Sequence, residues 1–472
     1  MSADDAYEFL DREVVGSRLC DHHAASRRPG LCSANLVIMK KTFVPPEQLA
    51  MLPYLGRWLV LASAAGVLAG TGSAALLVAL DWATATRVSH PWLLWLLPFA
   101  GLAVGLAYHY LGQSVEGGNN LLIDEIHDPK RIVPKRMAPL ILAGTVVTHL
   151  FGGSAGREGT AVQMGGSFAD YLTRLFRLGA QARRILLMAG ISAGFASVFG
   201  TPLAGAVFGL EVLAIGRLRY DAILPCFVAA IVGDLIPPLL GVHHTAYAVP
   251  FVPHPGPLTL GAMVLAGIVF GLAGMTFAEA THRLSRALKR RVAFGPLRPL
   301  LGGAVVAGAA MLIGTDKYLG LGIPTIVAAF QGPLPAYDFA GKMAFTVATL
   351  ASGFKGGEVT PLFYIGATLG NALAYVLPLP VPLLAGAGFV AVFAGAANTP
   401  IASTIMAMEL FGPEVGVFAG IACVVSYLFS GHTGIYPAQR VGHAKRARVP
   451  EGLRLSEVPA FQRAERDAAE KH

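Results

Sequence analysis

Two glutamates stand 200 positions apart in this chain, and each interrupts an otherwise apolar stretch. The first lies in the run Gly156-Arg157-Glu158-Gly159-Thr160, and the second lies in Gly356-Gly357-Glu358-Val359-Thr360. A carboxyl group can bind and release a proton, and at the start of a helix it competes with an anion for the backbone N–H groups. The two runs therefore predict a site at which proton binding and anion binding are coupled.

The same landmarks follow each glutamate. Thr201-Pro202 and Glu211 follow the first, and Thr399-Pro400 and Glu409 follow the second, with 198 positions between the equivalent residues. A duplicated membrane unit of this kind predicts two inverted halves with a transport site between them. Glu211 and Glu409 come near the end of apolar segments, where we expect them to cap a neighbouring element or to lie at an interface.

The composition indicates that these elements lie in a membrane. Hydrophobic residues make up 54% of the chain and charged residues 14%, whereas a soluble domain carries about 25% charged residues. Three stretches without charged residues are long enough to span a bilayer: 58–80, 258–278 and 381–408. Shorter segments interrupted by glycine or proline predict half-helices that are buried in protein or line a watery cavity: 152–166, 191–209 and 353–370.

The expected fold is an all-α integral membrane protein of roughly 16 to 18 intramembrane helices, many of them tilted or broken, in two inverted repeats. We expect an N-terminal extension at 1–50, the two membrane repeats at 51–240 and 241–440, and a short tail at 441–472. The extension lacks hydrophobic periodicity and is predicted to be disordered or weakly docked. Because Met39 would also make a plausible start, residues 1–38 are predicted to be dispensable for transport.

Charge patterning argues for a membrane orientation and against other function classes. The net charge of +8 is concentrated in short polar segments and the tail after Arg440, which is typical of cytoplasmic loops and predicts that both termini are cytoplasmic. No basic stripe is interleaved with aromatic residues, so we expect no nucleic-acid partner. His243-His244 is predicted to lie in an exposed loop.

An enzyme is also disfavoured. The chain shows no nucleophile and base pair and no metal-ligand spacing, so an intramembrane hydrolase using Glu158 and Glu358 is not expected. We predict neither a metal site nor a cofactor.

Four runs of residues resemble conserved motifs of the CLC chloride channel and transporter family, and the resemblance extends over roughly residues 55–440. They are 156–160, 199–211 with its Thr-Pro pair, 356–361, and Ile435-Tyr436-Pro437. The resemblance implies a homodimer with one independent pathway in each subunit, in the lipid bilayer of a bacterial inner membrane.

Departures from the common CLC pattern resemble the fluoride-exporting branch of that family. Asn119 stands where most relatives have an anion-binding serine, Thr160 replaces the signature proline, and Glu358-Val359-Thr360 replaces isoleucine, phenylalanine and alanine. The implied function is fluoride export driven by inward proton movement; a chloride/proton exchanger and a passive anion channel remain alternatives. Val212 occupies the position at which proton-coupled chloride exchangers usually carry an internal glutamate, so protons would need another route.

The donor chemistry is consistent with fluoride, which is small, strongly hydrated and a strong hydrogen-bond acceptor. Asn119 offers two amide protons where serine offers one hydroxyl, and Thr360 adds a hydroxyl where alanine has none, although asparagine is also a frequent helix cap. We expect Glu158 to be the proton-titrated gate and Glu358 to orient a neighbour or share a proton. The resemblance implies an anion-binding set of Asn119, Gly156, Arg157, Gly159, Thr160, Val359, Thr360 and Tyr436.

Overall fold

The protein is almost entirely helical in the residues that its structure, a computed structural model, describes: 47–469 apart from 131 and 447–448. The predicted extension at 1–50 lies outside these residues except for the start of α2, and so does the segment 1–38 that we expect to be dispensable.

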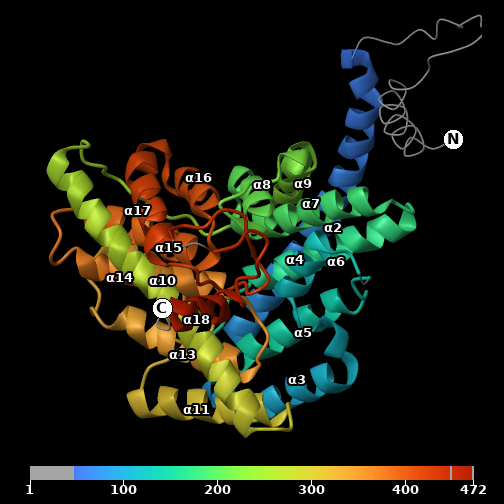
Figure 1. Cartoon of the computed structure of the whole chain (residues 1–472). Coiled ribbons are helices and arrows are strands. Elements are labelled where there is room, and N and C mark those ends of the chain that lie inside the picture. Colours follow the sequence, from blue (N-terminus) through green and yellow to red (C-terminus); the bar gives the residue numbers. More distant parts are fainter. Residues whose placement is uncertain (1–46, 131, 447–448, 470–472) are drawn as a thin grey trace, which may run out of the picture. The chain divides into compact units, whose positions relative to one another are not determined.

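The first half of the chain forms eight α-helices in its described part (Figure 1). They are α2 (Glu47–Ser89), α3 (Leu97–Leu111), α4 (Asn119–His127), α5 (Met137–Leu150), α6 (Glu158–Leu175), α7 (Ala180–Phe199), α8 (Pro202–Glu211) and α9 (Ile223–Leu239). Short 3₁₀ turns η1 (Pro91–Leu96), η2 (Gln113–Val115) and η3 (Tyr220–Ala222) join some of them.

The second half repeats this order. Its helices are α10 (Pro257–Arg291), α11 (Leu297–Ile313), α12 (Ile323–Gln331), α13 (Asp338–Ser352), α14 (Val359–Leu373), α15 (Val381–Ala397), α16 (Pro400–Phe411) and α17 (Gly416–Phe429), with the turn η4 (Pro413–Val415). The tail then adds strand β2 (Arg440–Val441), which pairs in parallel with β1 (Ala214–Ile215), and helix α18 (Val458–Ala469).

Equivalent helices of the two halves make equivalent contacts. Helix α6 packs on α7 and α14 packs on α15, while α8 and α16 lie against each other (Figure 1). The loops that lead into α6 and α14 pair as an antiparallel bridge, in which the N–H groups of Gly156 and Gly357 each donate to the other residue's carbonyl, at 2.6 and 2.7 Å. The two motif runs that are 200 residues apart in sequence therefore meet in space.

Reciprocal carboxylate caps join α8 to α16. Glu211, at the end of α8, accepts hydrogen bonds from the backbone N–H groups of Ile401 and Ala402 at 3.0 and 2.8 Å. Glu409 in α16 accepts them from Leu203 and Ala204 at 2.9 and 2.8 Å. The N-terminal N–H groups of a helix lack partners within the helix, and a carboxylate also interacts favourably with the helix dipole. The prediction that these glutamates cap neighbouring elements is confirmed.

The predicted helix breaks are present, and one predicted span is wrong. The segments 152–166, 191–209 and 353–370 are all interrupted by non-helical residues. The stretch 381–408 is not one span, because α15 ends at Ala397 and Asn398 adopts a left-handed conformation with φ 59°. Pro400 then begins α16, and Thr399 before it has a non-helical conformation with φ −128° and ψ 64°, because a following proline disfavours the helical region.

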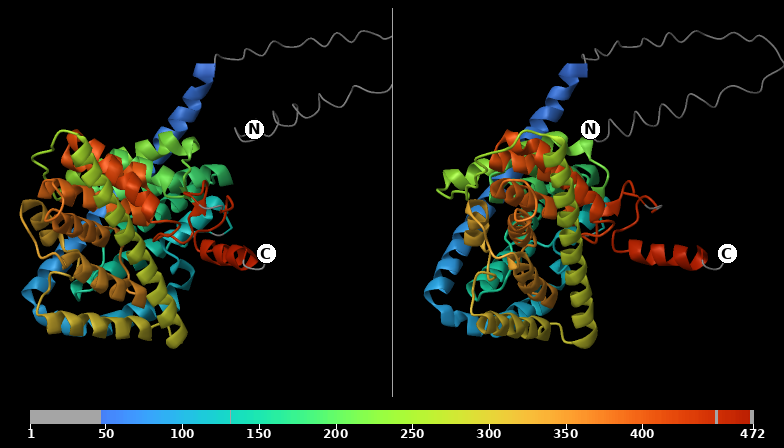
Figure 2. Two further views of the ribbon diagram at one scale, coloured as in Figure 1. Left: turned by 60° about the vertical axis from the view of Figure 1, so that its left-hand side comes forward. Right: turned by 90° about the vertical axis from the view of Figure 1, so that its left-hand side faces the viewer.

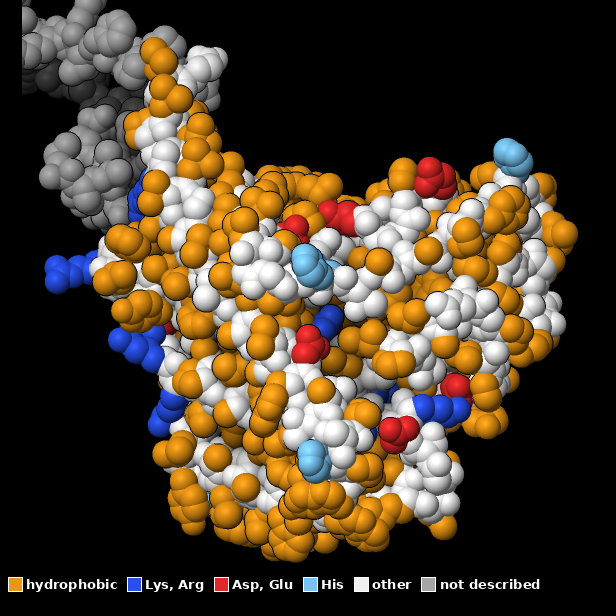
Figure 3. Space-filling model, turned by 180° about the vertical axis from the view of Figure 1, so that it is seen from behind, with side chains coloured by type: hydrophobic (Ala, Val, Ile, Leu, Met, Phe, Trp, Pro, Cys, Tyr) orange, Lys and Arg blue, Asp and Glu red, His pale blue; other side chains and the backbone are white. Residues whose placement is uncertain are grey.

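Among the described residues, five helical segments are long and apolar enough to cross a membrane: 51–89, 91–111, 180–199, 220–239 and 257–291. The predicted spans 58–80 and 258–278 lie inside α2 and α10. Helix α10 runs alongside α13, α15 and α17, as both views of Figure 2 show. On the face seen in Figure 3, hydrophobic side chains predominate and charged side chains are few, which is the surface expected to face lipid.

Candidate functional site

The N-termini of three helices converge where the two halves of the chain meet. Helix α4 begins at Asn119, α6 begins at Glu158, and α14 begins at Val359. Helix N-termini present unpaired N–H groups and a partial positive charge, so they form a site suited to an anion.

The carboxylate of Glu158 occupies this site and is almost completely buried, with 1% of the residue exposed. It accepts a hydrogen bond from the backbone N–H of Thr360 at 2.9 Å, and the Thr360 hydroxyl lies 2.6 Å from both of its oxygens. The Arg157 backbone N–H is 3.2 Å away, and the Arg157 guanidinium is more distant at 3.6 Å. Glu158 is therefore held mainly by the start of α14, and only weakly by the side chain of its neighbour Arg157.

Glycines permit this close approach. A Cβ atom at Gly156 would lie 3.0 Å from a Glu158 carboxylate oxygen and 2.8 Å from the ring of Pro361. A Cβ atom at Gly159 would lie 3.1 Å from the Cα of Gly357 and 3.2 Å from the amide nitrogen of Asn119. The predicted glycine positions thus lie at the site and leave room for the carboxylate and the helix ends.

Asn119 lies beside the site, and Tyr436 lies near both glutamates. The side-chain carbonyl of Asn119 accepts no hydrogen bond from the described residues, and its side chain lies beside Gly159. The next residue, Asn120, accepts a hydrogen bond from the Ala438 N–H at 3.1 Å. This bond fixes the start of α4 against the segment that carries the buried Tyr436.

Thr160 and Thr360 occupy equivalent positions in the two repeats but have different partners. Whereas Thr360 donates to Glu158, the hydroxyl of Thr160 lies 2.7 Å from that of Thr145, which donates in turn to the Ile141 carbonyl. The Thr160 side chain is therefore directed towards α5 and away from the Glu158 carboxylate. Val359 is the first residue of α14 and is buried.

Two cavities border the site. One, of about 200 Å³, is here called the Tyr436 cavity; the polar residues that line it include Glu116, Asn119, Gln163, Lys355, Glu358 and Tyr436. The other, of about 20 Å³, is called the Arg157 cavity; Arg157, Glu158, His244, Tyr247 and Thr360 line it. A cavity of that size holds about one water molecule. Glu158 and Glu358 thus line different cavities, with Thr360 beside Glu158.

Sequence reasoning missed two residues that line these cavities. Lys355 lies three residues before Glu358 and lines the Tyr436 cavity; an ionisable residue in an apolar segment is a signal that could have identified it. His244 is half-buried in the Arg157 cavity, whereas its neighbour His243 is exposed as predicted. Burial and the nearby charge of Arg157 lower the pKa of His244, which favours a neutral ring at pH 7.

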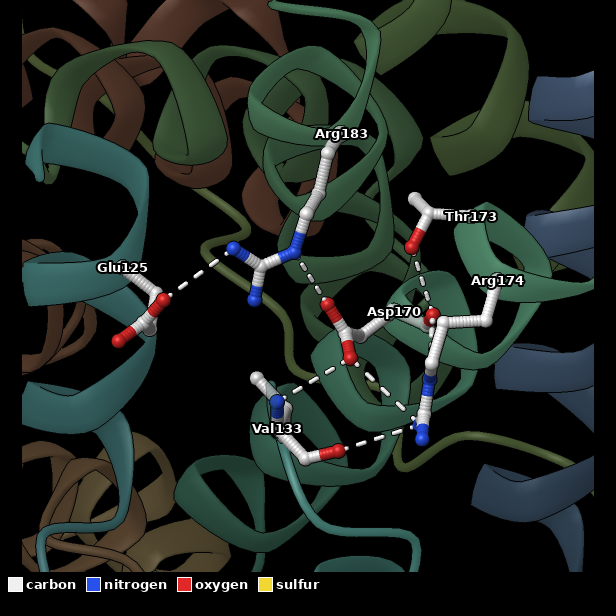
Figure 4. Close-up of polar contacts among 6 residues, drawn as sticks. All are labelled: Glu125, Val133, Asp170, Thr173, Arg174 and Arg183. Carbon is white, nitrogen blue, oxygen red and sulfur yellow. Dashed lines mark hydrogen bonds and ion pairs between the residues drawn. The ribbon is translucent and has the colours of Figure 1, made fainter. Parts of the chain in front are cut away.

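A buried ion-pair network holds α4, α6 and α7 together at a distance from the site (Figure 4). Asp170 of α6 accepts from Arg183 Nε of α7 at 2.6 Å and from the Val133 N–H at 3.1 Å. Arg183 also lies 3.2 Å from a carboxylate oxygen of Glu125 in α4. Because α4 and α6 start at Asn119 and Glu158, this network fixes the two helices whose N-termini form the site.

Val212 is buried at the end of α8. Its carbonyl accepts a hydrogen bond from the Gln439 side chain at 2.8 Å, so this position packs against the segment that precedes β2.

Known proteins resemble this chain in sequence and in fold. A family profile described as "Voltage gated chloride channel" matches residues 100–431. A "Chloride/fluoride channel protein" of Pseudomonas syringae pv. tomato is 61% identical over 436 residues, covering 91% of this chain and 96% of that protein. An "H(+)/Cl(-) exchange transporter ClcA" of Cronobacter sakazakii is 29% identical over 381 residues, covering 75% and 81%. A solved CLC-type fluoride/proton antiporter shares 35% identity with a TM-score of 0.80, covering 83% of this chain and 99% of that one.

Proposed function

The chain belongs to the voltage gated chloride channel (CLC) family, and from that premise we propose that it exports fluoride across a membrane in exchange for protons. The observation that carries the proposal is the carboxylate of Glu158, which lies on the N–H and hydroxyl donors of Thr360 at the start of α14. These donors can also bind an anion, so the Glu158 carboxylate and fluoride compete for one anion-binding position.

Proton binding decides this competition. When deprotonated, Glu158 fills the anion place and separates the two cavities. Once protonated it is neutral, its hold on the Thr360 donors weakens, and it can leave them to an anion arriving from the Tyr436 cavity. Each anion released towards the Arg157 cavity then leaves a protonated Glu158, whose proton can be passed to the opposite side. Proton movement is thereby tied to anion movement.

The donor set supports fluoride as the substrate. Fluoride holds its hydration water strongly, so a buried site must offer strong donors in exchange. Thr360 contributes both a backbone N–H and a hydroxyl at distances below 3 Å from the anion place. The amide of Asn119 adds a further donor beside Gly159. Similarity to the CLC-type fluoride/proton antiporter and to the chloride/fluoride channel protein supports the same substrate.

Glu358 supplies a route for protons in the absence of a carboxylate at Val212. Its side chain lines the Tyr436 cavity together with Tyr436, so a proton released from Glu158 can reach the aqueous side through this carboxyl group. The role assigned to Glu358 is thus proton sharing. No hydrogen bond joins it to Thr360 within the part of the chain that the structure describes.

We place the Tyr436 cavity on the cytoplasmic side, in an inner membrane, with both termini cytoplasmic and two copies of the chain per molecule. Basic residues support the orientation: the last turn of α10 carries Lys289, Arg290 and Arg291. The tail packs on the cytoplasmic loops through β1 and β2, and Arg454 pairs with Asp124 of α4 at 2.9 Å. Positive residues gather on the cytoplasmic face of membrane proteins.

Purified protein in liposomes tests this function. Fluoride efflux is followed with an ion-selective electrode and proton movement with a trapped pH dye, for the wild type and for Glu158→Gln. In the wild type, fluoride leaving the liposomes down its gradient should drive protons inward. Glu158→Gln should lose this proton movement because an amide cannot titrate. Proton pumping that persists in Glu158→Gln would refute the assigned gate.

The alternatives have separate signatures in the same assay. Similarity to an H(+)/Cl(-) exchange transporter makes chloride/proton exchange the second candidate, and a larger chloride than fluoride flux in the wild type would favour it. Fluoride flux without any proton movement would indicate a passive channel.

A further inference from the structure

Lys355 is a positive charge in the wall of the Tyr436 cavity. It lies in the segment between α13 and α14, where it is partly buried, and it shares the cavity with Asn119, Glu358 and Tyr436. Neither the transport cycle nor the three helix N-termini described above uses this side chain.

Two neighbouring helices hold the side chain of Lys355 in place. Its ammonium lies 3.9 Å from the ring centroid of Tyr108 in α3, which is a favourable cation–π distance. Gly144 of α5 leaves room for the aliphatic stem, because a Cβ atom there would approach the Cβ and Cγ of Lys355 to 3.0 and 3.1 Å. The ammonium is thus positioned by packing.

The ammonium of Lys355 has N–H donors that no hydrogen-bond acceptor of the described residues occupies. In the part of the chain that the structure describes, it makes no hydrogen bond and has no carboxylate oxygen within 4.0 Å. Other lysines are satisfied: Lys342 donates to the carbonyls of Tyr318 and Gly320 at 3.1 and 2.7 Å, and Lys317 pairs with Asp338 at 2.5 Å. An ammonium group has three N–H donors, and an aromatic face replaces its lost hydration only in part.

The other charged groups of the cavity are acidic. Glu116 is exposed, Glu358 is partly buried, and both line the cavity. An anion that enters would meet these two carboxyl groups, and Lys355 is the basic side chain among the residues that line the cavity. A positive charge at this point offsets their repulsion.

From this geometry we infer that Lys355 binds the transported anion in the Tyr436 cavity and passes it to the donors of Asn119 and Thr360. Lys355 is then a second anion-binding position of the pathway, on the side from which the anion enters. The inference rests on the proposed function, which supplies the anion and its direction.

The test measures fluoride uptake into inside-out membrane vesicles, whose outer face is the cytoplasmic face of the protein. Lys355→Met removes the charge but keeps most of the length of the side chain. It should raise the KM for fluoride by about tenfold while the maximal rate stays within about twofold, since a charge near the anion acts mainly on binding. Lys355→Arg keeps the charge and should retain a KM close to that of the wild type.

Lys289→Met is the matched control. Lys289 is an exposed residue in the last turn of α10 and does not line the cavity. This variant therefore loses the same charge from the cytoplasmic face and reports any effect that Lys289 exerts on Lys355 from a distance. An unchanged KM in Lys355→Met, or an equal rise in KM in Lys289→Met, would overturn the inference. If Lys355→Met fails to fold, Lys355→Gln serves in its place, and an unchanged KM in that variant carries the same meaning.

Failure of the proposed function has a different signature. The proposed function is contradicted if the wild type prefers chloride or moves fluoride without protons. In either case the inference about Lys355 is still tested, by comparing the KM for the transported anion between the wild type and the variant.

Discussion

The hydroxyl of Thr360 provides the sharpest test of how fluoride is selected. It lies 2.6 Å from both oxygens of the Glu158 carboxylate, and the backbone N–H of the same residue lies 2.9 Å from one of them. If fluoride takes the place of this carboxylate, it receives the same two donors. Thr360→Val removes the hydroxyl, keeps the shape of the side chain and leaves the backbone donor in place.

The expected size of the effect follows from hydrogen-bond energies. A hydrogen bond to an ionised acceptor contributes about 1.5–3 kcal/mol, and a weaker neutral-type bond about 0.5–1.5 kcal/mol. Fluoride, the stronger acceptor, should lose about 2 kcal/mol in the variant, and the larger chloride ion should lose about 1 kcal/mol. The difference of about 1 kcal/mol lowers the preference for fluoride over chloride by about fivefold.

Paired efflux measurements from one liposome preparation, with fluoride and chloride electrodes, give this ratio directly. Thr160→Val is the matched control, because Thr160 holds the equivalent position in the first repeat but bonds to Thr145 on α5. It should leave the ratio unchanged. A fluoride preference that survives Thr360→Val, or one that falls equally in Thr160→Val, would refute the assignment of the Thr360 hydroxyl to the anion.

Three further perturbations test the site and the elements that support it. Asn119→Ser should lower the fluoride-to-chloride flux ratio, because two amide donors are replaced by one hydroxyl donor; an unchanged ratio would show that selectivity lies elsewhere. Asp170→Ala should destabilise the detergent-solubilised protein by about 3 kcal/mol, since it removes the buried carboxylate that Arg183, Arg174 and the Val133 N–H share. Asp221→Ala at the exposed pair with Arg219 should cost no more than about 1 kcal/mol, and equal shifts in thermal unfolding would contradict this. Glu211→Ala should lower the stability by about 1–2 kcal/mol, because it removes the cap of α16. The loss should exceed that of Glu409→Ala, because Glu211 is the more buried of the two; the reverse order in the same thermal assay would argue against the caps.

Much of this architecture could be predicted because the sequence repeats its unusual residues at matching points. The paired glutamates and the Thr-Pro pairs predicted two equivalent halves, and the halves meet through Gly156 and Gly357. Hydrophobicity alone misjudged the stretch 381–408, since it contains no charged residue to mark the break at Asn398. A proline after a threonine was the available signal, and the equivalent Thr201-Pro202 pair breaks the first repeat in the same way.

The partners of individual side chains could not be predicted from the repeat. Thr160 and Thr360 are equivalent by position, yet only Thr160 has a threonine hydroxyl of a neighbouring helix within 2.7 Å. In the first repeat the Thr160 hydroxyl bonds to Thr145 of α5 instead of a glutamate, and no pattern within the motif carries that information. Lys355 was overlooked for a related reason: its importance depends on the cavity that it lines and on the ring of Tyr108, which lies far away in sequence.

The inverted relation of the two halves explains why equivalent glutamates serve different cavities. A two-fold axis in the membrane plane relates each residue that faces one side of the membrane to an equivalent residue that faces the opposite side. Glu158 lines the Arg157 cavity and Glu358 lines the Tyr436 cavity, with the bridge between Gly156 and Gly357 at the point where the halves meet. Duplication thus places one titratable group on each side of the anion donors. In the proposed cycle, a pathway arranged in this way exchanges protons with both aqueous phases without the internal carboxylate that Val212 replaces.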